Sequence, residues 1–429
     1  MSSAPAPVAP FDRRYVRYTL WVLLVVYILN FLDRQIVNIL AEPIKNDLGL
    51  SDTQVGLMTG LAFALFYAVL GIPIARYADA PQSNRVGLIS VSLAVWSGMT
   101  VLCGLATNFV QLLLARIGVG VGEAGCTPAA HSLITDTVEP AKRASSIAFY
   151  GLGIPIGGLL GMVIGGFLAD AYGWRSAFVV VGLPGLLMAL LVWFTMKEPR
   201  RFRVVTAAAP APLRATFTEA LAEIRASRAF VPLTIGGGFV AFLGYGKGVW
   251  TTIFFQRTHD LSPGEVGLYL GIGYGVAGVI GTWLGGFLAD RFGRRDARHY
   301  LTAPIVSMVV AAPLLFWSYS VDDWRLALVI LFVPTIANSL YYGPVYACAQ
   351  SLVSARSRAV AASIMVFAQN LIGLGLGPLF FGLLSDALRP LAGDESVRWV
   401  LFGAAFLGVV PAFFFWRASR FLNAEMKNR

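Results

Sequence analysis

Asp33 and Arg34 lie in the middle of an apolar run that extends from Tyr18 to Leu40. The run is long enough to cross a bilayer, for which about 20 residues at about 1.5 Å each suffice. An ionised side chain at that depth costs about 2.5–3.5 kcal/mol on insertion scales, so such groups face a protein interior or a watery cavity. We interpret this pair as part of a route by which something crosses a membrane.

Arg116 and Glu123 form a second pair of charges inside an apolar run. They are seven residues apart, which is two helical turns or about 10.5 Å, and therefore share one face of a helix. The glycine-rich tract 118–122 between them lets another helix or a ligand come close.

Together with Asn30, which shares a face with Asp33 and Arg34, these residues form a set of two acids and two bases. Such a set can hold a proton on Asp33 or Glu123 while an arginine pairs with the other carboxylate. The alternative is a fixed ion-pair network that only fastens helices together. We favour the functional interpretation, because buried ion pairs stabilise packing poorly.

Further polar side chains lie in the later apolar runs. Lys247 could meet a phosphate or carboxylate head group, or it could extend its ammonium to the interface or pair structurally. The hydrogen-bonding candidates for substrate contact are Tyr341, Tyr342, Gln350, Gln369 and Asn370. Aromatic belts at the membrane interface would explain the tyrosines equally well.

The composition is that of a membrane protein, since only 13% of the 429 residues are charged and 57% are hydrophobic. Soluble proteins carry about 25% charged residues. The net charge of +10 does not indicate nucleic acid, because the basic residues fall between apolar spans. We find no catalytic set, metal spacing, disulfide framework or P-loop, and therefore expect no enzyme, no cofactor and a gradient as the energy source.

Hydropathy predicts an all-α protein with twelve spans in two six-helix bundles. With both termini in the cytoplasm, 24 of the 33 lysines and arginines lie on the cytoplasmic side, six lie outside and three lie within spans. The linker carries amphipathic spacing that predicts a short helix. The expected divisions are a tail (1–17), a first bundle (18–196), the linker (197–229), a second bundle (230–416) and a tail (417–429).

This layout resembles the major facilitator superfamily. Residues 286–295 are similar to its cytoplasmic signature G-x-L-x-D-R-x-G-R-R, and a degenerate copy occupies 75–85. The resemblance implies an inner gate in which an aspartate accepts from helix-end amides and pairs with an arginine in one state only. The residues so implicated in gating are Asp79, Arg85, Arg143, Asp290 and Arg294.

Within the superfamily the chain is most similar to the Spinster lipid transporters. The matching pieces are NFLDR (30–34), SDTQVGL (51–57), GEAGCTPAAHSLITD (122–136), FYGLGIPIGGLLG (149–161), GWR (173–175) and NLIGLGLGP (370–378). This resemblance implies proton-linked transport of a lysophospholipid or sphingoid lipid by alternating access. We expect a monomer in the inner membrane of a bacterium, with the small amphiphile, protons and the lipid bilayer as its partners.

Symporters of small organic anions, of the hexuronate or dicarboxylate type, share NFLDR and remain the alternative. A passive channel or a membrane enzyme would be an alternative of another class.

Overall fold

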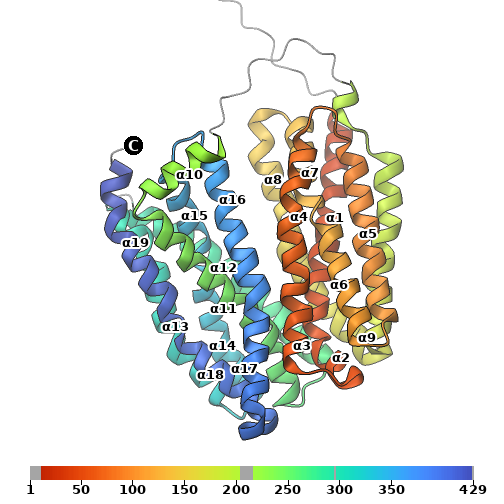
Figure 1. Ribbon diagram of the computed structural model, residues 1–429, viewed down its shortest axis with the longest axis vertical. Coiled ribbons are helices and arrows are strands. Elements are labelled where there is room, and N and C mark those ends of the chain that lie inside the picture. Colours follow the sequence, from red (N-terminus) through yellow and green to blue (C-terminus); the bar gives the residue numbers. More distant parts are fainter. Residues whose placement is uncertain (1–10, 203–215, 294–295, 428–429) are drawn as a thin grey trace, which may run out of the picture. The chain divides into compact units, whose positions relative to one another are not determined.

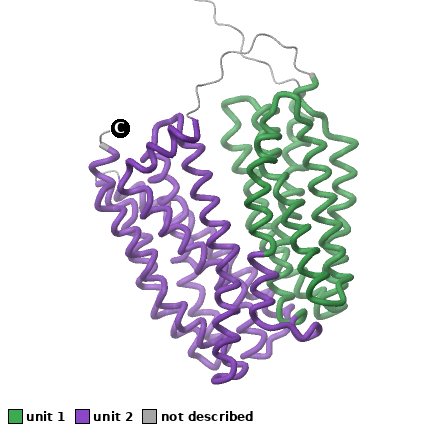
Figure 2. The backbone as a smooth tube through the Cα atoms, in the orientation of Figure 1, with its two compact units in different colours: residues 1–44, 62–208 green, residues 45–61, 209–429 purple. Residues whose placement is uncertain are grey.

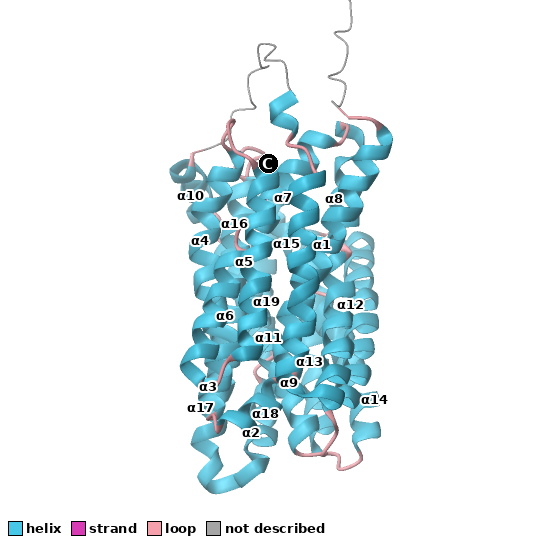
Figure 3. Cartoon of the chain, turned by 90° about the vertical axis from the view of Figure 1, so that its right-hand side faces the viewer, coloured by secondary structure: helices cyan, strands magenta, loops and turns pink. Residues whose placement is uncertain are grey.

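The computed structural model describes residues 11–202, 216–293 and 296–427. Within these ranges the secondary structure is helical, with short turns and no strand, as Figure 3 shows. The all-α prediction is therefore confirmed for the described residues.

Contacts divide the chain into two compact units, coloured separately in Figure 2. Unit 1 comprises residues 1–44 and 62–208, and unit 2 comprises residues 45–61 and 209–429. The segment 45–61 comes from the first half of the sequence, yet its contacts place it in unit 2.

The helices of unit 1 are labelled in Figure 1. They are α1 (Arg13–Ile39), α4 (Ala62–Asp79), α5 (Arg85–Leu105), α6 (Phe109–Glu123), α7 (Cys126–Thr137), α8 (Arg143–Gly151) and α9 (Gly153–Thr195). The short helix α2 (Ala41–Leu48) runs across the boundary between the units.

Unit 2 begins with α3 (Asp52–Gly56) and the π-helical turn η1 (Leu57–Leu61). Its other helices are α10 (Phe217–Ala226), α11 (Phe230–Arg257), α12 (Pro263–Gly293), α13 (Thr302–Ser320), α14 (Trp324–Ser339), α15 (Tyr342–Ser351), α16 (Arg358–Ala368), the π-helical η5 (Gln369–Leu376), α17 (Gly377–Ala392), α18 (Ser396–Phe406) and α19 (Val409–Lys427).

Among the described residues, nine helical stretches are long and apolar enough to cross a membrane, or ten if the bent pair α10 and α11 counts as one span. Two of the nine, Pro140–Arg201 with 62 residues and Arg358–Met426 with 69, are far longer than the roughly 20 residues of one crossing. Each contains a glycine with positive φ, Gly173 at 81° and Gly393 at 56°. Counting each of these stretches as two passes, and the bent pair α10 and α11 as one more, is consistent with the twelve spans predicted.

Glycines set how closely α1 and α9 approach each other. A Cβ at Gly157 would lie 2.4 Å from the carbonyl oxygen of Ile28, and one at Gly161 would lie 2.6 Å from that of Leu32. Small residues four apart allow this contact between membrane helices. It fixes α1, which carries Asp33 and Arg34, against the part of α9 that precedes the break at Gly173.

Two elements at the edges of unit 2 add detail to the expected divisions. A helix, α10, lies in the predicted linker, and it begins with a capping box between Thr216 and Glu219. Of the apolar residues that give this segment its amphipathic spacing, Ile224 is buried, whereas Phe217 is exposed. At the other end α19 continues to Lys427, so the segment expected as a tail from residue 417 is helical over its described part.

Candidate functional site

Charged side chains from α1 and α6 meet inside unit 1. Arg34 Nε donates a hydrogen bond to Glu123 Oε2 at 2.6 Å, and this contact is also a salt bridge. The Glu123 side chain has no exposed surface, and the Arg34 side chain is 15% exposed. The ion pair therefore joins α1 and α6, the two helices on which the sequence predicted the charged residues of the site.

Asp33 lies beside this pair but is held differently. It is buried, and Thr100 Oγ1 on α5 lies 3.0 Å from its Oδ2. The same hydroxyl lies 3.0 Å from the carbonyl oxygen of Trp96, so its one hydrogen serves either acceptor. Among the described residues, Asp33 forms no salt bridge and its Oδ1 has no hydrogen-bond partner.

Other buried polar atoms of this cluster also lack partners in the described part of the chain. They are both amide atoms of Asn30, Nε of Arg116 and Oε1 of Glu123. Buried polar groups in proteins are nearly always hydrogen-bonded, so several such atoms in one place are unusual. The cluster can take up a proton, or it can form further hydrogen bonds with a water molecule or a polar ligand group.

Aromatic rings surround the two guanidinium groups. The Arg34 guanidinium carbon lies 5.0 Å from the ring centroids of Phe31 and Phe63 and 4.6 Å from that of Tyr67. The Arg116 carbon lies 5.5 Å from the Phe63 centroid. Such cation–π contacts stabilise a charge that has left bulk water. Sequence analysis missed Phe63 and Tyr67, because nothing distinguishes them from the chain's other aromatic residues.

The glycine tract of α6 allows neighbouring helices to pack closely around the charged cluster. A Cβ at Gly120 would lie 2.6 Å from the carbonyl oxygen of Phe63, and one at Gly122 would lie 2.6 Å from the backbone nitrogen of Trp96. The tract therefore admits the backbones of α4 and α5. Their approach places the Phe63 ring and Thr100 beside the charges.

The residues assigned to gating in unit 1 have different environments. Arg85 has no exposed surface and forms salt bridges with Asp136 at 2.7 Å and with Glu198. It thereby fastens α5 to α7 and to the segment after α9. Asp79 ends α4 and is exposed, and Arg143 Nε donates to the carbonyl of Val138 at 3.4 Å.

The intact signature motif lies at the end of α12 in unit 2. Asp290 is exposed in the last turn of that helix. Arg294 lies outside the described residues. The gating roles of all five residues stay predictions.

The polar candidates of unit 2 are dispersed over several helices. Gln369 is buried and its Oε1 accepts from Tyr346 Oη at 2.9 Å. Tyr342 and Gln350 are exposed, and Tyr341 and Asn370 are half-buried. Lys247 is buried in a small pocket of its own, which is described below.

A charged cluster that sequence analysis missed lies around α3 in unit 2. Asp52 has no exposed surface and forms salt bridges with Lys45 and with Arg257, the latter at 2.9 Å. Ser385 donates to Asp52 Oδ2 at 2.6 Å, and Asp386 accepts from the backbone N–H of Asp52 at 3.0 Å. These bonds attach α3 to α11 and α17. In the sequence, Lys45 and Arg257 are two of the six basic residues expected outside the membrane, and nothing there indicates that they pair with Asp52.

Over its described residues the chain is helical, with repeated apolar spans and buried, partly paired charges, and these are features of a membrane transport protein. Residues 23–378 match the sequence model of the Major Facilitator Superfamily. The chain belongs to this superfamily, and its expected fold class is confirmed.

Two similar proteins and one solved structure show which members of the superfamily the chain is similar to. It is 35% identical over 399 residues to an MFS-type efflux pump of Mycolicibacterium smegmatis, covering 93% of this chain and 91% of the other. It is 27% identical over 381 residues to the hexuronate transporter of Bacillus subtilis, and the match covers 85% of this chain and 87% of the transporter. A crystal structure of a bacterial homologue of the human lysosomal transporter Spinster, inward-facing and unoccupied, superimposes with a TM-score of 0.88 at 35% identity, covering 98% and 99%. The resemblance to Spinster predicted from the sequence is confirmed.

Proposed function

We propose that this protein is a proton-linked secondary transporter of an amphiphilic, lipid-like substrate and works by alternating access. The observation that carries the proposal is the pairing within unit 1. Among the described residues, the carboxylate of Glu123 forms a salt bridge with Arg34, whereas the buried carboxylate of Asp33 has a hydroxyl within hydrogen-bond reach and forms no salt bridge.

This difference suits the binding and release of a proton. An ionised carboxylate buried without a cation is costly, and a proton removes that cost. Loading or unloading the proton changes the net charge of the cluster by one. Arg34 and Arg116 can then exchange carboxylate partners, and a transporter that rocks between two states can favour one pairing in each.

The surroundings of Arg34 favour a substrate with one polar end. Its side chain is 15% exposed, and the rings of Phe31, Phe63 and Tyr67 lie beside its guanidinium group. A phosphate or carboxylate head can hydrogen-bond to the guanidinium while an apolar chain lies against the rings. Lysophospholipids and sphingoid lipids have this form, and the similarity to Spinster supports this class.

The charge distribution supports a location in the inner membrane of a bacterium with both termini in the cytoplasm. A cysteine introduced at the exposed Asp322 would then react with a membrane-impermeant reagent from outside. One introduced at the exposed Thr216 would react only after permeabilisation. The three native cysteines, Cys103, Cys126 and Cys348, are buried.

Transport driven by a pH gradient into proteoliposomes tests the proton link. We expect Asp33→Asn to abolish the response to the gradient, because the amide cannot take up a proton at this position. The matched control is Glu139→Gln, which alters an exposed carboxylate paired with Lys142 in the same unit. It should leave the response to the gradient intact.

A full response to the gradient in a monodisperse Asp33→Asn protein would refute the proton link. Loss of the response in both variants would show only that unit 1 tolerates no carboxylate change.

A transporter of small organic anions is the second candidate, because the hexuronate transporter of Bacillus subtilis is among the relatives. The same charges could bind a carboxylate of a polar substrate. The two candidates differ in the class of substrate that stabilises the protein, and this difference is tested below.

A further inference from the structure

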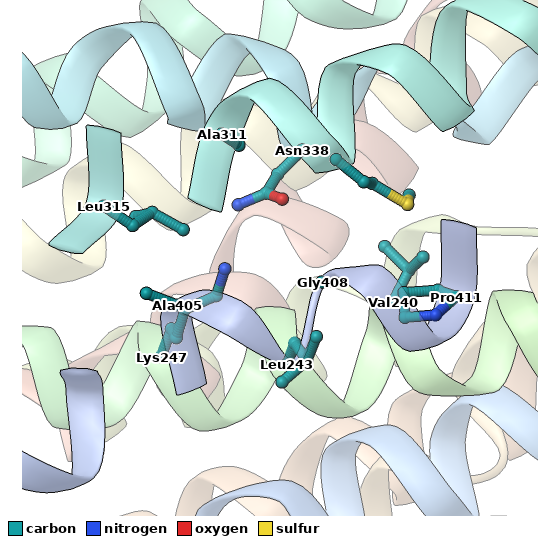
Figure 4. Close-up of a pocket in the computed structure, with 10 residues that line it drawn as sticks. Val240, Leu243, Lys247, Ala311, Leu315, Asn338, Ala405, Gly408 and Pro411 are labelled. Carbon is teal, nitrogen blue, oxygen red and sulfur yellow. The ribbon is translucent and has the colours of Figure 1, made fainter. Parts of the chain in front are cut away.

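Unit 2 contains a small pocket that lies apart from all the contacts described above. Figure 4 shows its lining, which comes from α11, α13, α14, α18, α19 and the turn between the last two helices. The lining residues are Val240, Leu243, Lys247, Met308, Ala311, Leu315, Asn338, Ala405, Gly408 and Pro411. Eight of the ten are apolar or glycine, and none is acidic.

The two polar members of this lining converge. In Figure 4 the Lys247 ammonium and the Asn338 amide point toward one another across the pocket. Lys247 is only 8% exposed, and among the described residues it forms no salt bridge and no hydrogen bond. Asn338 is half-buried on the neighbouring helix α14.

A buried ammonium without a counter-ion is unfavourable, so burial of Lys247 calls for a negative partner. The protein supplies none in the pocket lining. The ammonium and the amide N–H₂ group both donate hydrogen bonds, which is the chemistry that an anion needs. The apolar walls leave little room and exclude a large, hydrated ion.

We propose that this pocket is a binding site for a small anion, held by Lys247 and Asn338 inside unit 2. The ligand is a monatomic anion such as chloride or the carboxylate group of a small organic molecule. Its negative charge compensates the buried ammonium and stabilises the packing of α11 against α14. The site does not depend on the proton-linked cluster, which lies in unit 1.

The thermal stability of the purified full-length protein in different salts tests this site. We expect the melting temperature of the wild type to rise saturably in sodium chloride or sodium acetate compared with sodium gluconate at equal ionic strength. Gluconate is too large for the pocket. A larger rise in acetate would identify a carboxylate as the ligand, and a larger rise in chloride would identify the inorganic ion.

Two variants should abolish this rise. Lys247→Met removes the cation but keeps a long apolar side chain. Asn338→Asp places a carboxylate opposite the lysine, which would take the position of the anion with little change of volume. The second variant keeps the test decisive if the first does not fold.

The matched control is Lys142→Met, which removes a lysine that is 61% exposed in unit 1. It should keep the full response to the anions. Equal melting temperatures of the wild type in all three salts would overturn the proposal. So would an undiminished response in Asn338→Asp or in a folded Lys247→Met protein.

Discussion

The buried charges of unit 1 differ in what holds each of them. In the described part of the chain, Glu123 forms a salt bridge with Arg34 and Arg116 contacts the Phe63 ring, whereas Asp33 forms no salt bridge and lies within hydrogen-bond distance of the Thr100 hydroxyl. A network built for stability alone would pair every charge, because a half-satisfied buried network is worse than an apolar one. The uneven pairing therefore supports a cluster whose charge changes during the transport cycle.

The Arg34–Glu123 pair can be tested by removing one partner or both. Arg34→Met should destabilise the protein by about 3–5 kcal/mol, because it leaves Glu123 buried without its cation. The double variant Arg34→Met with Glu123→Met should recover most of that loss, since apolar residues of similar volume often replace a buried pair without penalty. Thermal unfolding in one detergent measures both. If the double variant is less stable than the single one, the pair itself is essential to packing.

Part of this cluster could be predicted from the sequence. The spacing of Asn30, Asp33 and Arg34 places them on one helical face, and the same holds for Arg116 and Glu123. The sequence could not predict that Thr100 faces Asp33, because they are 67 residues apart and serine and threonine are common in membrane helices. The contacts around Asp52 could not be predicted either, because its partner Arg257 is 205 residues away in the sequence.

At the scale of the helices, glycines decide how the unit 1 elements meet. On α9 they admit the backbone of α1, and on α6 they admit the backbones of α4 and α5. Between membrane helices there is no hydrophobic driving force of the kind that acts in water, so close backbone packing contributes much of the attraction. The charged cluster is thus positioned by small residues that carry no chemistry of their own.

Valine substitutions can separate this packing role from mere helix propensity. Gly120→Val should lower stability by about 1–3 kcal/mol or more, because its Cβ would lie 2.6 Å from the carbonyl oxygen of Phe63, a backbone atom that cannot move freely. Gly71→Val on α4 is the matched control, since a Cβ there has nothing within 4 Å. The melting temperatures of the two variants give the comparison. Equal losses would show that the close approach at Gly120 contributes nothing specific.

The helical elements were predictable to a large extent, because long apolar runs have few alternatives in a membrane. The details at their ends were not. Hydropathy could not show that contacts would assign residues 45–61 to unit 2, where α3 and η1 pack against α17. Nor did it predict the π-helical turns η1 and η5, which depend on tertiary packing and which often mark functional segments of helices.

At the scale of the whole molecule, the surface is as informative as the interior. Large apolar side chains such as Leu187, Phe194 and Trp283 are more than 60% exposed, which would cause aggregation in water and is suited to lipid. Among the described residues, the polar candidates of unit 2 are dispersed over several helices, and Lys247 is buried in its own pocket. A substrate that needs many hydrogen bonds along its length would need partners from several separate helices.

The class of substrate is therefore the prediction that concerns the whole protein. Each hydroxyl or carboxylate of a sugar acid that is buried without a partner would cost about 1–3 kcal/mol, whereas a lipid-like molecule needs partners only for its head. We expect lysophospholipids or sphingoid phosphates to raise the melting temperature of the purified protein more than hexuronates or short dicarboxylates do. Arg34→Ala should reduce the rise that the lipids cause, since the guanidinium is the proposed partner of the head group. A larger rise with the organic acids, again lost in Arg34→Ala, would instead assign the protein to the transporters of small anions, because a ligand that binds only the folded state stabilises it in proportion to its affinity.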